Sequence, residues 1–247
     1  MKMKIGFLGA GKMAQGILSA MKSTKGVLLS SIEDNRNREV AEKCDLVFLS
    51  VRPQDVAAVA AEVRPLLRAD QTLVSIVAGK TLAKLRRAFG PKVKLIRVMP
   101  NLALRARAGM CAVCPAPNAP HRAVETVLDI LGAAGETVIL KERDFDAVTA
   151  LSGSGPAYFA YMEEAMTEGG VALGLKPAVA RLLAEQTMYG TAKFLRESKM
   201  DLAAFIAGVC TKGGTTAAGM KHLSVKSFKK TIAATLAAAA ARSKELA

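Results

Sequence analysis

The chain has 247 residues, of which 51 % are hydrophobic, so it is long enough to bury a core, and its composition excludes an intrinsically disordered protein. Only 4 % of the residues are aromatic and Trp is absent, which leaves few side chains for stacking on bases or sugars. A formal net charge of +14 favours anionic ligands in general, but the basic residues are scattered and form no recognisable nucleic-acid-binding module. We therefore expect no nucleic-acid partner.

The sequence contains no apolar stretch close to the roughly 20 residues that cross a bilayer. Gly9 and Gly11 interrupt the apolar run near the N-terminus, which excludes the continuous apolar region of a signal peptide. We expect a cytoplasmic protein without membrane contact, and four cysteines suit a reducing compartment. Cys111 and Cys114 form a C-x-x-C pair within a predicted strand, where residues three apart face opposite ways. The pair therefore predicts buried thiols and no metal site.

Strand-like and helical segments alternate through the first part of the chain. Strands are predicted at Lys4–Leu8, Val27–Ser31, Leu46–Val51, Leu73–Val77, Val93–Val98, Met110–Cys114 and Thr137–Leu140. Helical spacing marks Lys12–Met21, Gln54–Leu67 and Arg122–Leu131. This alternation predicts a parallel, doubly wound sheet with helices on both faces.

The strand signals stop after about residue 142. Helical spacing follows at Tyr158–Leu173, Ala178–Arg196 and Ser224–Lys244. The chain is thus predicted to be an α/β protein in which an N-terminal Rossmann-type domain, residues 1–142, is followed by an all-helical domain, residues 143–247.

A glycine-rich turn connects the first predicted strand to the first predicted helix. Gly9, Gly11 and Ala14 form a G-x-G-x-x-A pattern, in which glycines allow a tight turn and a close approach of the backbone to a ligand. The helix that follows offers unpaired N–H groups to a pyrophosphate. The position of this turn at the start of an alternating chain predicts a dinucleotide site.

The end of the second predicted strand carries Ser30 and Ser31 where an acidic residue would favour NAD. Hydroxyl groups tolerate a ribose phosphate, and Arg36 or Arg38 is placed to pair with it. We therefore predict NADPH as the cofactor, with NADH as the alternative.

Several motifs, in order along nearly the whole chain, carry a family resemblance. They are VRPQ (51–54), SIVAG (75–79), RVMPN (97–101), DAVTALSGSGPAY (146–158) and GGTTAAG (213–219). Together they closely resemble pyrroline-5-carboxylate reductase. The resemblance implies a Rossmann domain and a helical dimerisation domain, in a homodimer that often assembles into larger rings such as a decamer. It also implies that the protein uses NADPH or NADH to reduce 1-pyrroline-5-carboxylate to L-proline, which is the last step of proline biosynthesis.

The resemblance also implies site residues. Cofactor contacts fall on Gly9, Gly11, Lys12, Met13, Ser31, Asn37, Val51, Arg52, Pro53 and Ala78. Substrate contacts fall on Glu142, Gly213, Gly214, Thr215 and Thr216. Hydride attack on a C=N bond is easiest when its nitrogen is protonated, so Thr216 is the expected hydrogen-bond partner of the ring nitrogen. Glu142 is expected to favour the cationic ring, and the GGTT turn to direct N–H groups at the substrate carboxylate.

The sequence departs from the family pattern in places. The family usually carries a further helix and strand between the positions of Ser31 and Asn37, which bears on the choice between NADPH and NADH. Thr211 and Lys212 stand where the family usually has Ser-Pro. The run from Ser152 to Gly155 follows a helical segment and is interpreted as a tight bend, not as a hydrolase nucleophile turn.

Two alternative functions stay open. One is a related imine or 2-hydroxyacid oxidoreductase on the same scaffold, and the other is a non-catalytic dinucleotide- or nucleic-acid-binding protein.

Overall fold

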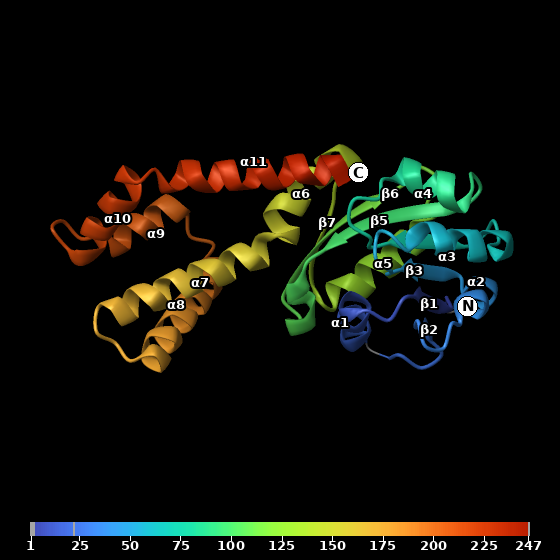
Figure 1. The fold of residues 1–247 in the computed structure, drawn as a ribbon, viewed down its shortest axis with the longest axis horizontal. Helices are drawn as coiled ribbons and strands as arrows, with labels where there is room; N and C mark the ends of the chain where they lie inside the picture. Colours follow the sequence, from blue (N-terminus) through green and yellow to red (C-terminus); the bar gives the residue numbers. More distant parts are fainter. Residues whose placement is uncertain (1–2, 22, 247) are drawn as a thin grey trace. The chain divides into compact units, whose positions relative to one another are not determined.

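The computed structural model describes residues 3–21 and 23–246 (Figure 1). The chain divides into two units. Unit 1 comprises Met1–Pro156 together with Ala237–Ala247, and unit 2 comprises Ala157–Leu236. Unit 2 is thus an insertion between two separate stretches of sequence that fold together as unit 1.

Unit 1 is built around a sheet that has seven strands in the described part of the chain, in the order β2-β1-β3-β4-β5-β6-β7. The strands are β1 (Ile5–Leu8), β2 (Leu28–Ser30), β3 (Leu46–Leu49), β4 (Thr72–Ser75), β5 (Lys94–Pro100), β6 (Gly109–Pro115) and β7 (Gly135–Ile139). Each of them overlaps a predicted strand. The order reverses between β2 and β3 on either side of β1, which is where such sheets bind ligands, at the carboxyl ends of the strands.

The expectation of a wholly parallel sheet was wrong at one position. β5 and β6 pair antiparallel, with Val98 opposite Val113, whereas the other neighbouring strands pair parallel. The reason is the length of the connection. A parallel crossover needs a dozen or more residues, but β5 and β6 are separated only by Asn101, the short 3-10 helix η2 (Leu102–Ala106) and two further residues.

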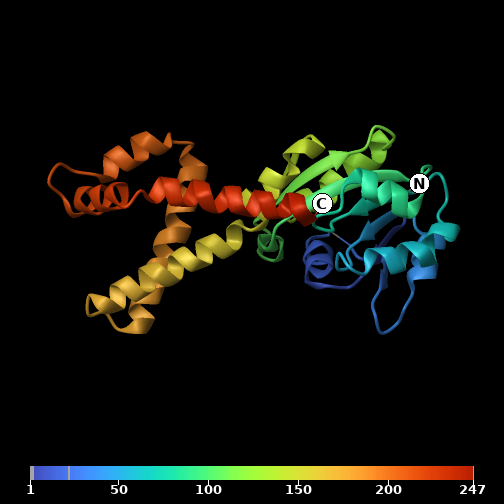
Figure 2. The same ribbon diagram turned by 45° about the horizontal axis from the view of Figure 1, so that its top comes forward.

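Helices cover both faces of the sheet, as predicted (Figure 2). On one face, α1 (Lys12–Ala20) and α5 (His121–Gly132) share a buried cluster with the sheet, and Phe7 stacks on Phe48 at 4.7 Å between ring centroids. The other face carries α2 (Asn37–Lys43), α3 (Val56–Val63) and α4 (Leu82–Phe89), with the 3-10 turn η1 at Arg64–Leu66. The apolar spacing that predicted α1, α3 and α5 marks the side that these three helices bury.

The segment Ser31–Arg36 connects β2 directly to α2. A turn is closed within it, since the Ser31 hydroxyl accepts hydrogen bonds from the N–H groups of Glu33 and Asp34 at 3.2 Å each. The Asp34 carboxylate in return accepts from the Ser31 N–H at 2.7 Å. The connection contains no further strand that could pair with the free side of β2, so β2 is an edge strand of the sheet in the described part of the chain.

Cys111 and Cys114 lie on β6, as predicted, and pack into clusters on opposite faces of the sheet. Both thiols are free and buried. Burial raises the pKa of the Cys111 thiol to about 12 and also raises that of Cys114. Across residues 3–21 and 23–246, no three His, Cys, Asp or Glu side chains cluster as metal ligands do.

After β7 the chain forms three short helical segments, η3 (Glu142–Asp144), α6 (Phe145–Val148) and η4 (Thr149–Gly153), the last of which is a π-helix. Gly153 lies so close to the Met99 side chain that a Cβ would collide with it. The Asn101 amide donates to the Ser152 hydroxyl at 3.4 Å. This bend therefore lies against the carboxyl end of β5, which fits its interpretation as a close-packing turn.

Five helices follow: α7 (Gly155–Ala172), α8 (Pro177–Ser198), α9 (Leu202–Val209), α10 (Thr215–Val225) and α11 (Phe228–Leu246). Within unit 2, large apolar side chains stay exposed, among them Phe159, Tyr161, Leu182, Leu183 and Tyr189. The buried residues of α8 are only alanines, at 180 and 184. None of the helices in the described residues is long and apolar enough to cross a membrane.

The end of α11 belongs to unit 1. Ser243 is 5 % exposed, and its hydroxyl donates a hydrogen bond of 2.7 Å to the Asp146 carboxylate on α6. Leu246 contacts the turn at Gly79, where an added Cβ would lie 3.1 Å from the Leu246 carbonyl oxygen. The last turns of α11 thus cover the loop that follows β4.

Candidate functional site

The glycine turn lies at the carboxyl end of β1, as predicted. Gly9 has φ +101°, and an added Cβ would be 2.8 Å from the Ser50 carbonyl oxygen, so both the backbone conformation and the close neighbour require glycine. The Ser50 hydroxyl donates to the carbonyl oxygens of Leu8 and Gly9, at 3.1 and 2.7 Å. These bonds fix the turn against the end of β3.

Gly11 is the N-cap residue of α1, and the protein itself does not explain why it is glycine. Its φ of −68° suits any residue, and an added Cβ would meet only the Ser50 carbonyl oxygen, at 4.0 Å, among the described atoms. Gly11 and Lys12 are exposed. A bare backbone at the open N-terminus of a helix fits a bound pyrophosphate, because the unpaired N–H groups and the helix dipole both favour an anion.

A cavity of about 380 Å³ lies beside this turn. Five of the predicted cofactor residues line it together: Gly9, Ser31, Asn37, Val51 and Arg52. It is bounded by the carboxyl ends of β1, β2 and β3, the Ser31–Arg36 turn and one side of α3. The sequence prediction therefore placed these five residues in one site.

A chain of hydrogen bonds crosses this cavity. The Ser30 hydroxyl donates to the Asn37 amide oxygen, and the Asn37 amide nitrogen donates to the Glu62 carboxylate, each at 2.8 Å. Glu62 comes from α3 and was not predicted as a site residue. A sequence signal for it was lacking, because a single acid on an amphipathic helix resembles a solvated surface residue.

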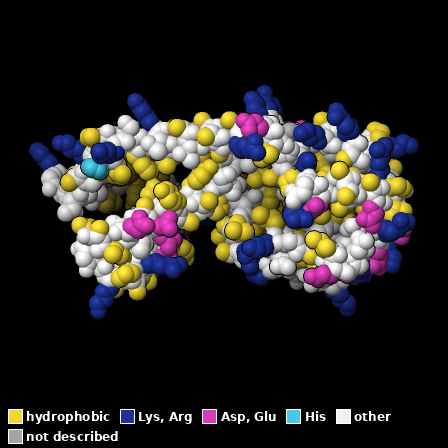
Figure 3. Space-filling model, in the orientation of Figure 1, with side chains coloured by type: hydrophobic (Ala, Val, Ile, Leu, Met, Phe, Trp, Pro, Cys, Tyr) yellow, Lys and Arg dark blue, Asp and Glu magenta, His cyan; other side chains and the backbone are white. Residues whose placement is uncertain are grey.

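Cations are less prominent in this cavity than the net charge suggests. Arg52, the cation among its described lining residues, bonds to Asp55 through its Nε at 2.8 Å. Arg36, predicted as a phosphate partner, instead pairs with Glu39 at 2.7 Å. Figure 3 shows Lys and Arg side chains spread over the visible face rather than gathered at one place.

The other predicted cofactor residues lie around the cavity's rim or beyond it. Met13 is half-buried in the first turn of α1, and Pro53 is exposed after β3. Ala78 is exposed at the turn that follows β4, between buried Val77 and Gly79. Gly79 has φ +69°, which lets the chain reverse there and present Ala78 outward.

Glu142 is held by two donors in unit 1. Its Oε1 accepts from the Leu82 N–H at 2.6 Å and from Arg97 Nη1 at 2.9 Å. Arg97 is buried, and its guanidinium also lies over the Phe145 ring, 4.6 Å from the centroid. Glu142 thus fixes the N-terminus of α4 to β5. The sequence prediction gave it a substrate role and missed this structural one, although Arg97 was visible in the RVMPN motif.

The predicted carboxylate-binding turn lies in unit 2. Gly213 has φ +74°, and Gly214 is the N-cap residue of α10, with its N–H bonded to the Thr211 carbonyl oxygen at 3.0 Å. A Cβ on Gly214 would collide with the Thr211 side chain. Thr215 and Thr216 form the first turn of α10 and are exposed. The turn therefore presents a helix N-terminus, as the GGTT pattern predicted.

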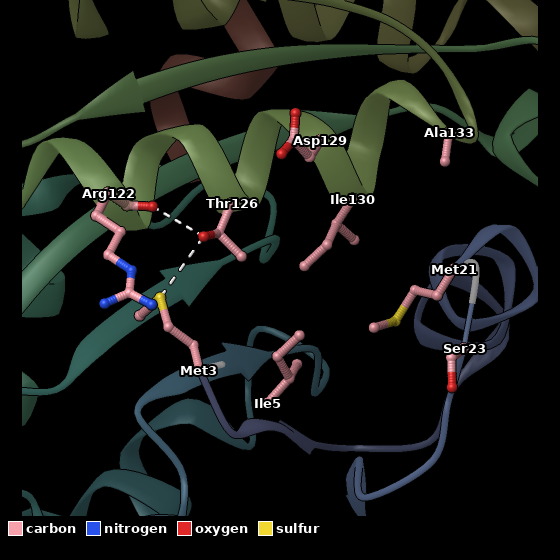
Figure 4. A pocket seen from close by; sticks show the side chains of 9 residues that line it. All are labelled: Met3, Ile5, Met21, Ser23, Arg122, Thr126, Asp129, Ile130 and Ala133. Carbon is pink, nitrogen blue, oxygen red and sulfur yellow. Dashed lines mark hydrogen bonds between the residues drawn. The ribbon is translucent and has the colours of Figure 1, made fainter. Parts of the chain in front are cut away.

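A larger cavity, of about 530 Å³, lies at the amino end of β1 (Figure 4). Met3, Ile5, Met21 and Ile130 give it an apolar lining. Thr126 lies on α5 at its edge and donates to the Arg122 carbonyl oxygen at 2.8 Å. The predicted cofactor site is at the opposite, carboxyl end of the same strand. Size alone therefore does not identify the functional cavity.

Comparison with known proteins gives matches to both parts of the chain. Residues 142–246 match a family described as pyrroline-5-carboxylate reductase dimerisation, and residues 19–79 match one described as NADP oxidoreductase, coenzyme F420-dependent. Pyrroline-5-carboxylate reductase 3 of Rattus norvegicus is 32 % identical, over 98 % of this chain and 96 % of that protein. Pyrroline-5-carboxylate reductase of Arabidopsis thaliana is 35 % identical, over 98 % and 95 %.

Solved structures are similar over the same extent. The structure of Plasmodium falciparum pyrroline carboxylate reductase with NADP bound matches with a TM-score of 0.87 and 28 % identity, over 99 % of this chain and 98 % of that one. The pyrroline-5-carboxylate reductase of Coxiella burnetii matches with a TM-score of 0.90 and 27 % identity, over 100 % and 99 %. The resemblance thus covers both units.

Proposed function

The chain belongs to the pyrroline-5-carboxylate reductase family, and from this premise we propose how its residues carry out the NAD(P)H-dependent reduction of 1-pyrroline-5-carboxylate to L-proline. The observation that carries the proposal is the glycine turn beside a cavity at the sheet's switch point, in a chain similar to these reductases over nearly its whole length. When bound, the reduced nicotinamide supplies a hydride to the carbon of the C=N bond.

The chain's own residues bind and orient the two reactants. The N-terminus of α1 holds the pyrophosphate, Ser31 and Asn37 face the adenosine ribose, and Ala78 faces the nicotinamide. Because Gly11 is bare and exposed, the pyrophosphate can approach the backbone closely. Holding both reactants at near-attack distance lowers the barrier by about 7 kcal/mol or more.

The turn at Gly213 and Gly214 and the first N–H groups of α10 bind the substrate carboxylate, and Lys212 adds a positive charge beside them. Thr216 is the catalytic hydrogen-bond partner of the ring nitrogen. As the hydride arrives, the positive charge of the protonated imine is neutralised and the nitrogen becomes an amine, so this hydroxyl acts where charge changes. Glu142 favours the cationic ring, and its bond to Arg97 orients it.

The exposed apolar side chains of unit 2 support a homodimer, since a helical unit without a large core of its own buries that surface against a second copy. Figure 3 shows apolar side chains at the surface of these helices. We further propose that dimers assemble into a larger ring such as a decamer, and that the protein works in the cytoplasm. Light scattering tests the assembly, and a stable, active monomer at micromolar concentration would contradict it.

The reaction is tested by following NADPH oxidation with 1-pyrroline-5-carboxylate and by detecting proline as the product. Turnover that saturates with both reactants is expected. NADPH binding without turnover on this substrate would favour a related imine or 2-hydroxyacid oxidoreductase, for which the Lys212 replacement is the relevant departure. Absence of NADPH and NADH binding would favour a non-catalytic protein.

A further inference from the structure

The cavity beside the glycine turn contains an unexpected negative charge. Its described charged lining residues are Arg52, Asp55 and Glu62. Arg52 and Asp55 pair with each other at 2.8 Å and are largely neutralised by this contact. Glu62 bonds to an uncharged amide, that of Asn37. The lining of the cavity thus carries one more negative charge than positive.

The position of Glu62 matters because Asn37 and Ser31 are the residues that face the adenosine ribose in the proposed function, on which this inference rests. In dinucleotide sites, a carboxylate near the ribose accepts a hydrogen bond from the 2′-hydroxyl of NADH, while cations accommodate the 2′-phosphate of NADPH. Here the second strand ends in Ser30 and Ser31, without an acid. The carboxylate comes instead from α3, across the cavity.

Glu62 also controls the orientation of the Asn37 amide. The Asn37 oxygen is occupied by the Ser30 hydroxyl and one hydrogen of its nitrogen by Glu62, each at 2.8 Å. An amide has two N–H donors, so the second remains to meet the ribose or its phosphate. The same residue therefore helps to orient a donor and places a negative charge beside it.

We infer that Glu62 is a specificity-determining residue, which restrains the use of NADPH relative to NADH by repelling the 2′-phosphate. That phosphate carries close to two negative charges. The repulsion acts across a partly solvated cavity, so it alters the choice between the cofactors without preventing NADPH from binding.

Glu62→Gln is the central test because the new side chain keeps an oxygen that can accept from Asn37 while it loses the charge. We expect the ratio of kcat/KM for NADPH to that for NADH to rise by about five- to tenfold, estimated from the Coulomb energy at several Å in a high dielectric. The rise should shrink with increasing salt concentration. A contact that was merely structural would not produce this salt dependence.

Glu42→Gln is the matched control, because it removes the same charge as Glu62→Gln. Glu42 is exposed on α2 and does not line the described cavity. In this control, the ratio of kcat/KM for NADPH to that for NADH should stay within about twofold of the wild type, because solvent screens the charge of an exposed residue. Glu62→Ala removes both the charge and the bond to Asn37, so it should raise the ratio while weakening both cofactors.

Direct titration of each protein with NADPH and with NADH, without substrate, separates this inference from the proposed reaction. A shifted Kd ratio in Glu62→Gln without turnover on 1-pyrroline-5-carboxylate would support the inference and overturn the reaction. An unchanged Kd ratio, an equal loss for both cofactors or an equal shift in Glu42→Gln would overturn the inference. So would a wild-type protein that binds neither cofactor.

Discussion

Truncating Glu142 should destabilise unit 1 strongly, because one carboxylate oxygen serves both the Leu82 N–H and the Arg97 guanidinium. The side chain of Arg97 is 5 % exposed and that of Glu142 is 32 % exposed. Glu142→Ala therefore leaves a buried cation without its carboxylate. Breaking a buried pair in this way costs about 3–5 kcal/mol, and the partial exposure of Glu142, which lets water reach the guanidinium, places our expectation at about 3 kcal/mol.

Arg97→Met should cost less, about 1–2 kcal/mol, because the carboxylate that remains is partly hydrated and still accepts from Leu82. Urea denaturation followed by circular dichroism measures both losses. Hydrogen exchange at the start of α4 should accelerate more in Glu142→Ala than in Arg97→Met. A loss below about 1 kcal/mol for Glu142→Ala, or the reverse order of the two variants, would refute the reasoning from burial.

Glu142→Gln separates this structural role from the proposed catalytic one. The amide keeps an oxygen as acceptor for Leu82 but has no charge to favour a cationic ring. If the charge acts on the substrate, kcat falls while the free energy of unfolding changes by less than about 1 kcal/mol. A wild-type kcat would leave Glu142 with its structural role alone.

Other predictions concern the cofactor, the substrate and the thiols. Gly11→Val should fold normally, because a Cβ has room there, yet raise the KM for NADPH more than about tenfold; an unchanged KM would contradict the pyrophosphate assignment. Thr216→Ala should lower kcat by about 10- to 100-fold with little change in cofactor Kd, and near wild-type turnover would place the catalytic contact elsewhere. Burial raises the pKa of Cys44 to about 11 and that of Cys111 to about 12, above their ordinary 9.0. Keeping these two thiols protonated therefore contributes fully to the free energy of unfolding below about pH 9, and this contribution is lost as the pH rises towards 11 and 12. In denaturation experiments, the free energy of unfolding of Cys111→Ala should fall less steeply over this alkaline range than that of the wild type.

The fold was predictable because its signals are local. Each strand of the sheet is an apolar run that ends at a turn, and the order of strands and helices follows from their alternation. The antiparallel β5–β6 pair was missed because it depends on the length of a connection, which was not weighed against the needs of a crossover. α2 and α4 were not among the predicted helices, since in each of them charged residues outnumber the buried ones; α3, which is as short as α4, was predicted because it is almost wholly apolar.

The candidate site was predictable at the positions where the backbone conformation requires glycine. Gly9 and Gly213 adopt positive φ, and their patterns located both turns. Glu62 and the structural role of Glu142 were not predictable, because each depends on a partner far away in sequence. Asn37 is 25 residues from Glu62, and Arg97 is 45 from Glu142. Contacts of this kind leave no periodic signal in the chain.

The return of α11 to unit 1 sets an order for the folding of a newly made chain. Ser243 closes onto Asp146, 97 residues earlier in the sequence, and all of unit 2 is synthesised between them. The ribosome must therefore release residues 157–236 before the cover over the loop at Gly79 can form. Bringing such distant segments together carries a loop-closure entropy that unit 2 reduces if it folds first and shortens the connection. We expect the sheet of the nascent chain to form with the loop at Gly79 still uncovered, until the end of α11 has been synthesised and packs onto it.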